Sequence, residues 1–129
     1  MSTIKVNTIQ DAAGADSSTP NQIQQGRAKA WCNFNGTGMP AYRDSFGFNT
    51  GTGVIDNGVG DYTLTFSTAM PNANYSVCGS QDNGTSGAAM APMIKNANPP
   101  TTTTLRLQFA NGNGTAIDSA YNSVQVFGD

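Results

Sequence analysis

The segment Tyr62-Thr63-Leu64-Thr65-Phe66 alternates strictly between apolar or aromatic residues and threonine, and it decides the fold class. A second segment, Leu105-Arg106-Leu107-Gln108-Phe109, repeats the alternation with larger polar residues. Successive side chains of a β-strand point to opposite faces, so each segment would place its apolar residues on one face. Both segments are therefore predicted to be strands with one buried face and one polar face.

The body of the chain, from Arg27 to Asp129, is predicted to consist of consecutive strands. Asn-Gly and Asp-Asn-Gly sequences separate several of them and favour the positive φ angles of tight hairpin turns. Short strands with such frequent turns indicate an all-β fold, with an antiparallel β-sandwich or jelly-roll-like body. The eight predicted strands are 28–35, 43–48, 53–56, 62–67, 75–80, 88–95, 103–110 and 121–127, and the glycine turns are 35–38, 56–58, 83–84 and 111–114.

Two strands near the ends of the body have inward and outward residues that can be assigned from the alternation. Ala30, Cys32 and Phe34 are expected to face the core, as are Val124 and Val126. The residues expected on the opposite face are Trp31, Asn33 and Phe127. An outward Trp31 would stack on a sugar, fill a subunit interface or join a second core layer. The stretch Arg43, Asp44, Phe46 and Phe48 would likewise recognise a glycan or a partner subunit.

Residues 1–26 differ from the body and are predicted to form a short extended N-terminal arm. The arm begins with the β-prone stretch Thr3–Ile9 and continues through small and polar residues. A short helix is then indicated by Thr19 as N-cap, Pro20 at the first helical position, Gln22 three residues after the cap, and Gly26 as the stop. The arm has too little apolar surface to fold alone, so it would be either disordered or ordered by docking onto something larger. We expect docking, because the strand and cap signals are specific.

The composition argues against several classes of function. The chain contains neither histidine nor glutamate, which removes the commonest side chains for acid–base catalysis, and no spacing marks Lys5, Lys29 or Lys95 as a base. Only 11% of residues are charged and the net charge is −2, which disfavours nucleic acids and anionic membranes as partners. No apolar run is long enough to cross a bilayer, and no secretory signal is evident, so synthesis in a cytoplasm is expected. We therefore predict a noncatalytic protein without a cofactor.

Two remaining motifs are assigned structural roles. The segment 56–61 holds carboxylates and amides that could bind calcium, but it lacks the spacing of an EF-hand loop and is predicted to be a hairpin turn. No metal site is predicted. Cys32 and Cys78 both lie in predicted strands and are expected to be buried thiols, while a disulfide between them cannot be inferred from their spacing.

Several segments together resemble small structural proteins of tailed bacteriophages, particularly the tail-fibre-like proteins of cyanophages. The resemblance covers nearly the whole chain, departs from the phage pattern at Cys32 and Cys78, where apolar residues would be expected, and involves no catalytic motif. The segments that carry it are 2–10, 26–31, 33–38, 56–66, 68–75 and 126–129.

This resemblance implies a virion component made in the host cytoplasm, placed in the tail rather than the capsid. It implies a homotrimeric fibre or fibre tip whose arm binds other virion proteins through Ile4, Val6 and Ile9, and whose body contacts the host surface, including its glycans. The chain is short for a fibre with a shaft, which leaves a tail-attached knob, an adaptor or a capsid decoration protein as alternatives. A monomeric carbohydrate-binding or adhesin module is another alternative. Polar loop residues are the candidate receptor contacts: Gln81, Asp82, Asn83, Asn96 and Asn98.

Overall fold

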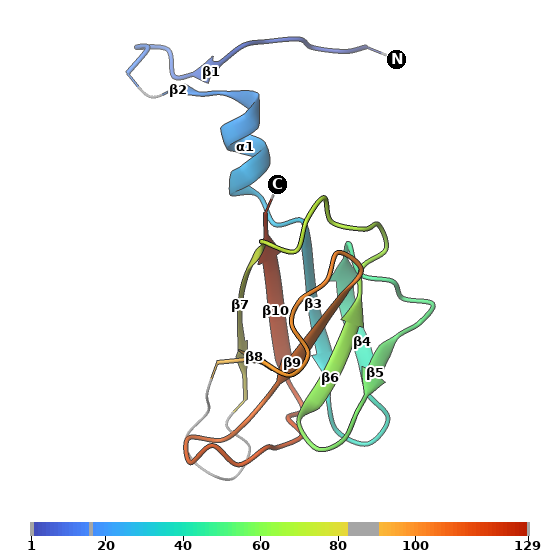
Figure 1. Cartoon of the computed structure of the whole chain (residues 1–129). Coiled ribbons are helices and arrows are strands. Elements are labelled where there is room, and N and C mark those ends of the chain that lie inside the picture. Colours follow the sequence, from blue (N-terminus) through green and yellow to red (C-terminus); the bar gives the residue numbers. More distant parts are fainter. Residues whose placement is uncertain (1, 16, 83–90, 129) are drawn as a thin grey trace.

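The computed structural model describes residues 2–15, 17–82 and 91–128. It consists of a β-sandwich body and an N-terminal arm that extends from one end of that body (Figure 1). The body contains two four-stranded antiparallel sheets, in the orders β4-β3-β10-β7 and β5-β6-β9-β8. The prediction of an all-β sandwich is therefore confirmed. Among the described residues, no helix is long and apolar enough to span a membrane.

The strands of the body lie close to the ranges predicted from the sequence. The predicted strand 88–95 is observed only as the short β8, and its residues 88–90 lie outside the described residues. The observed strand β4 begins two residues earlier than predicted and ends before Phe48, which instead forms an isolated bridge to Phe66. The strands are β3 Ala30–Asn35, β4 Ala41–Phe46, β5 Val54–Asp56, β6 Asp61–Thr65, β7 Ser76–Gln81, β8 Met93–Ile94, β9 Thr104–Gln108 and β10 Asn122–Phe127.

The core lies between the two sheets and contains the inward residues predicted from the alternation. Leu64 and Leu105 face each other across the β6–β9 pair, and both are fully buried. Three aromatic rings, those of Phe34, Tyr62 and Phe109, pack edge to face with centroids 5.3 to 5.8 Å apart. Such edge-to-face contacts favour one defined packing of the two sheets.

Two glycines permit close approaches that a larger residue would block. Gly60 has a φ of +65°, and an added Cβ would collide with the carbonyl oxygen of Phe109. Gly36, expected from its Asn-Gly context to supply a positive φ, does not do so. It is needed because a Cβ there would lie 2.7 Å from the Tyr62 hydroxyl. The sequence therefore predicted the position of this turn, but close packing against Tyr62, and not a positive φ, explains why residue 36 is a glycine.

The arm comprises a minimal hairpin followed by a helix. Strands β1 Ile9–Gln10 and β2 Ser17–Ser18 pair antiparallel, and α1 spans Pro20–Gly26. The predicted capping box is present, because the Thr19 side chain accepts from the Gln22 amide and the Gln22 side chain accepts from the Thr19 amide. No residue of α1 is buried, so local hydrogen bonds rather than packing define this helix.

Candidate functional site

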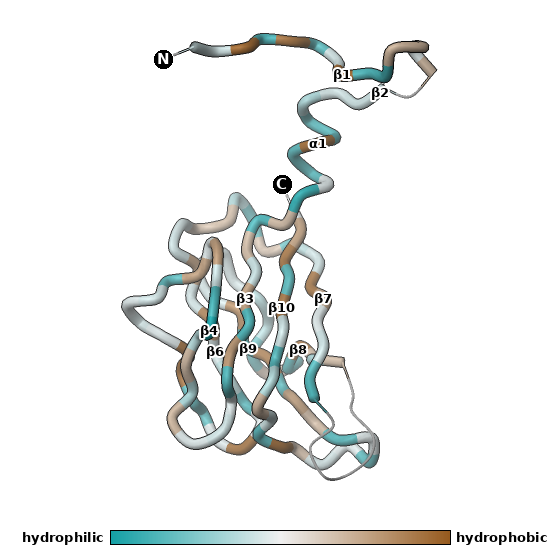
Figure 2. The backbone as a smooth tube through the Cα atoms, turned by 180° about the vertical axis from the view of Figure 1, so that it is seen from behind, coloured by the Kyte–Doolittle hydropathy of each residue, from teal (hydrophilic) through white to brown (hydrophobic). Residues whose placement is uncertain are grey.

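The arm exposes the apolar residues that were predicted to attach it to a larger particle. Ile4, Val6 and Ile9 are 88%, 45% and 56% exposed. Ile23 of α1 is also exposed, and with Pro20 these residues line an open groove of about 490 Å³. Hydrophobic stretches accordingly occur along the arm as well as inside the body (Figure 2). The structure thus gathers the three predicted attachment residues on one surface and adds Ile23 to it.

The outer face of the sheet β4-β3-β10-β7 carries an exposed row of side chains that includes Trp31. The strand register places Phe46, Trp31, Gln125 and Cys78 side by side, one on each strand, and we call these four residues the aromatic row. Trp31 is 37% exposed and Phe46 is 57% exposed, so neither side chain is buried in a second core layer formed by the described residues. Of the predicted roles of Trp31, a subunit interface and a sugar-stacking platform remain.

The mixed stretch around Arg43 is divided between the surface and the core. The Arg43 guanidinium lies 4.2 Å from the centre of the Tyr121 ring and donates to the carbonyl oxygen of Ala120. In contrast, Phe48 is buried and stacks on Phe66 with ring centroids 5.2 Å apart. Phe48 is therefore a core residue, and the expectation that it recognises a glycan or partner was wrong.

The two cysteines differ in their environments. Cys32 is buried in the core, as predicted, and burial raises the pKa of its thiol to about 12. Cys78 is exposed on the aromatic row, and its Sγ lies 3.4 Å from Oε1 of Gln125. The expectation of a second buried thiol was wrong because Cys78 occupies an outward position of the edge strand β7. Both thiols are free.

The predicted receptor-contacting residues do not form a single surface. The Gln81 side chain donates to the carbonyl oxygen of Ala110, beyond the end of β9, and an Asp82 carboxylate oxygen accepts from the Tyr121 amide. Asn98 instead lies beside the beginning of β9. The candidate residues Asn96 and Asn98 are both exposed, while Asn83 lies outside the described residues.

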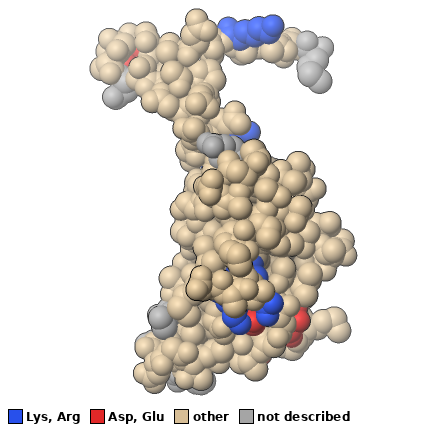
Figure 3. All heavy atoms as spheres, in the orientation of Figure 1, with Lys and Arg blue, Asp and Glu red and all other residues tan. Residues whose placement is uncertain are grey.

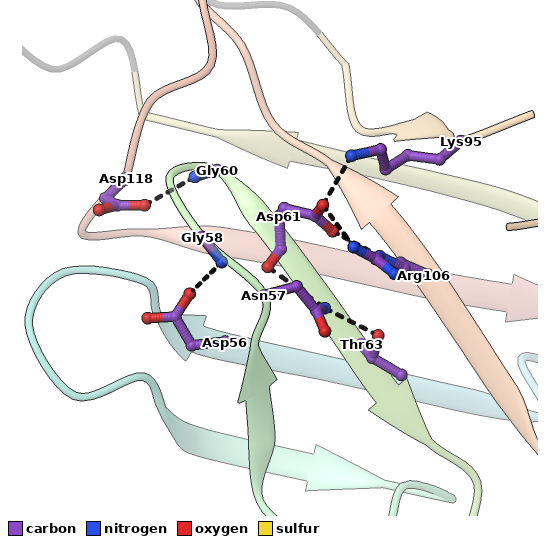
Figure 4. Close-up of polar contacts among 9 residues, drawn as sticks. All are labelled: Asp56, Asn57, Gly58, Gly60, Asp61, Thr63, Lys95, Arg106 and Asp118. Atoms are coloured by element: carbon purple, nitrogen blue, oxygen red, sulfur yellow. Dashed lines mark hydrogen bonds and ion pairs between the residues drawn. The ribbon is translucent and has the colours of Figure 1, made fainter. Parts of the chain in front are cut away.

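The segment 56–61 forms the β5–β6 hairpin turn, as predicted. A carboxylate oxygen of Asp56 accepts from the amide of Gly58, which closes the turn locally. Asp118 accepts from the Gly60 amide at 2.7 Å, and Asp61 points to the other side (Figure 4). Within the described ranges, no three Asp or Cys side chains are grouped in a way that suits a metal ion.

Asp61 is the centre of an ion cluster that sequence reasoning did not identify. Its carboxylate accepts two hydrogen bonds from Arg106, each 2.8 Å long, and one from Lys95 at 2.6 Å (Figure 4). The hydrogen bonds from Arg106 contribute most to lowering the pKa of Asp61 to about 2, so this carboxylate is ionised at neutral pH. We call Asp61, Lys95 and Arg106 the ion cluster.

A polar groove lies beside the ion cluster, on the outer face of the sheet β5-β6-β9-β8. Its volume is about 330 Å³, and the segment between β8 and β9 forms one wall. Charged atoms gather in this area, whereas most of the visible surface around it is uncharged (Figure 3). The lining residues are Thr63, Ala97, Asn98, Pro99, Thr101, Thr104 and Arg106.

Comparison of the chain with protein-family models, with characterised proteins and with solved structures finds no match. The surfaces that bear on function are the apolar arm, the aromatic row and the polar groove.

Proposed function

We propose that this chain is a noncatalytic structural protein of a phage virion, a homotrimeric component of a tail fibre or fibre tip. In this proposal residues 1–26 dock onto other virion proteins, and the body, residues 27–129, takes part in recognition of the host surface. The observation that carries the proposal is the exposure of Ile4, Val6 and Ile9 on an arm that lies outside a completed core. Burying one such side chain contributes about 1.5–3 kcal/mol, so the three together would supply much of the docking free energy.

Incorporation into particles tests the role of the arm. In phage carrying Ile4→Ser, Val6→Ser and Ile9→Ser together, we expect the protein to fold but to be missing from purified particles. The matched control is Ile55→Ser with Val59→Ser, because these residues are similarly exposed but lie on the body. Normal incorporation of the triple variant would contradict the proposal.

Deleting residues 1–26 separates attachment from folding in a second way. The core residues all belong to the body, so we expect the truncated chain to keep the circular dichroism and unfolding behaviour of the body. It should be absent from purified particles. Particles that contain the truncated protein would refute attachment through the arm.

The proposed trimer is supported by the exposed aromatic row, since burial of Trp31 and Phe46 between subunits would remove their apolar surface from water. The absolute mass in solution, measured by light scattering after size exclusion, should be that of a trimer. Trp31→Ala with Phe46→Ala should lower this mass to that of a monomer, whereas Met39→Ala, at an exposed position between β3 and β4, should not. A wild-type monomer at all concentrations would contradict the trimer and favour a decoration protein or a free carbohydrate-binding module.

A further inference from the structure

The polar groove beside the ion cluster has the size and lining of a small-ligand site. Its volume of about 330 Å³ lies at the lower end of the range for such sites, about 300–1,000 Å³. Its walls are rich in hydroxyl and amide groups, from Thr63, Thr101, Thr104 and Asn98. Groups that both donate and accept hydrogen bonds suit a ligand that carries several hydroxyls.

The groove carries a positive charge from Arg106, the one charged residue among those that line it. Arg106 uses Nε and Nη2 to bind Asp61, and its Nη1 donates to no other residue within the described ranges. Lys95 binds the same carboxylate, so two cations share one anion and the ion cluster keeps one positive charge. A planar guanidinium with a free nitrogen is well suited to receive a carboxylate.

The side chains of the groove are held in place before any ligand arrives. The Thr63 hydroxyl accepts from the Asn57 side chain at 2.9 Å, which leaves its own proton available for a ligand. Thr101 accepts from the amide of Thr104, and the carbonyl oxygen of Thr101 accepts from the Tyr75 hydroxyl. The segment that forms the wall is thereby fixed to the body, which reduces the entropy lost on binding.

From these observations we infer that the groove binds an acidic saccharide, with the sugar carboxylate at Arg106 and the sugar hydroxyls at Thr63, Thr104 and Asn98. The inference rests on the part of the proposed function that assigns surface recognition to the body. It is independent of attachment through the arm, and it names the class of ligand as a uronic acid unit of a surface polysaccharide.

Titration of the full-length chain, followed by nuclear magnetic resonance, tests this inference. The probes are glucuronate, glucose and inorganic sulfate at equal concentrations. We expect glucuronate to shift the signals of Thr63, Asn98, Thr101 and Arg106, and to bind at least tenfold more tightly than glucose. Sulfate should bind more weakly than glucuronate, because it lacks the sugar hydroxyls.

Variants assign the binding to the groove. Arg106→Gln should weaken glucuronate binding at least tenfold, as expected for the loss of hydrogen bonds to a charged group. Thr63→Val and Asn98→Ala should each weaken it about two- to tenfold. These two changes alter single polar groups at partly or fully exposed positions, so they report on binding even where Arg106→Gln impairs folding. The control is Thr115→Val, because Thr115 is an exposed threonine between β9 and β10 and does not line the groove; this change should leave binding unchanged.

Three results of the titrations would overturn the inference: no shifts in the groove at high glucuronate concentration, equal binding of glucose and glucuronate, or equal binding of sulfate and glucuronate. Unchanged affinity in both Thr63→Val and Asn98→Ala would also overturn it. None of these results depends on phage particles. The incorporation experiment therefore tests attachment through the arm independently of ligand binding in the groove.

Discussion

The arm and the body both contain alternating apolar residues, but only the body buries them. Ile4 and Val6 alternate with polar residues in the same way as Leu105 and Leu107 do, yet the former are exposed and the latter are fully buried. Burial differs because the body has a second sheet that covers the apolar face of each strand, whereas the arm has none. Strands β1 and β2 have two residues each and no second sheet, and an isolated two-stranded hairpin is marginal in water. An alternating pattern therefore predicts a buried face only where other elements can cover it.

The two regions also differ in how their polar groups are used. In the body, the charges of the ion cluster come from three different strands or their ends, so they connect parts of the chain that are distant in sequence. In the arm, the hydrogen bonds of the capping box and the one from Ala15 to Asp11 span three or four positions, and the β1–β2 pairing spans seven to nine. The body is thus stabilised by long-range contacts and the arm by local ones.

The largest difference between the regions should come from removing one apolar side chain from each. Leu64→Ala leaves a cavity in the core and should lower the free energy of unfolding by about 2–5 kcal/mol. Ile4→Ala should change it by less than about 0.5 kcal/mol, since Ile4 is 88% exposed. Urea unfolding followed by circular dichroism measures both values. Equal losses would show that the arm belongs to the folded core.

Alanine replacement of one glycine in each region should give the next largest contrast. Gly60→Ala forces a positive φ on alanine and a collision with the carbonyl oxygen of Phe109, so we expect a loss of about 1–3 kcal/mol. Gly26→Ala, at the end of α1, meets nothing within 4 Å and should be neutral. The same urea titration measures both. A neutral Gly60→Ala would contradict the close approach described for the β5–β6 turn.

The ion cluster should make the stability of the body depend on pH. The pKa of Asp61 is lowered from 3.8 to about 2 in the folded chain, so the unfolded chain binds this proton more readily. The contribution of ionised Asp61 to the free energy of unfolding is therefore complete above about pH 4 and is lost as the pH falls towards 2. Asp61→Asn should cost about 1–3 kcal/mol at pH 6 and much less at pH 2.

Unfolding free energies of wild type and Asp61→Asn at the two pH values measure this effect. Asp44→Asn is the control, because Asp44 is exposed and belongs to neither ion pair. A constant difference between wild type and Asp61→Asn across this pH range would contradict the ion cluster.

The smallest effect is expected in the arm, from loss of the helix cap. Thr19→Ala removes the acceptor for the Gln22 amide and should destabilise α1 by about 1 kcal/mol. The helical signal in circular dichroism should decrease, while the urea midpoint of the body stays the same. A lower midpoint would mean that α1 contributes to the stability of the body.

Local patterns predicted most of the fold, whereas contacts between distant segments could not be predicted. The alternation around Tyr62 and the capping residues of α1 depend on neighbours in the sequence, so both were predicted correctly. The burial of Phe48 and the exposure of Cys78 were not predicted, because they depend on where β4 ends and on the position of β7 at the edge of its sheet. A single strand pattern does not contain that information.

The candidate sites show the same limit. The exposure of the arm followed from its small apolar content, which can be counted in the sequence. The pairing of Asp61 with Arg106 depends on the register of β6 against β9, where Thr63 is opposite Arg106 and Asp61 is opposite Gln108. A lone arginine on the polar face of a predicted strand was the available signal, but its partner could be identified only once the register was known.

Hydrogen–deuterium exchange of the isolated chain tests the central claim most directly. This claim is that residues 1–26 do not pack on the body, whereas the body has a fully packed core. We expect the amides of residues 4–10 and 20–26 to exchange at nearly unprotected rates, because the short hairpin and the seven-residue helix pack against no core. The paired amides of β3, β6, β9 and β10 should exchange slower by orders of magnitude. Arm amides as protected as those strands would contradict the claim that the arm awaits a partner.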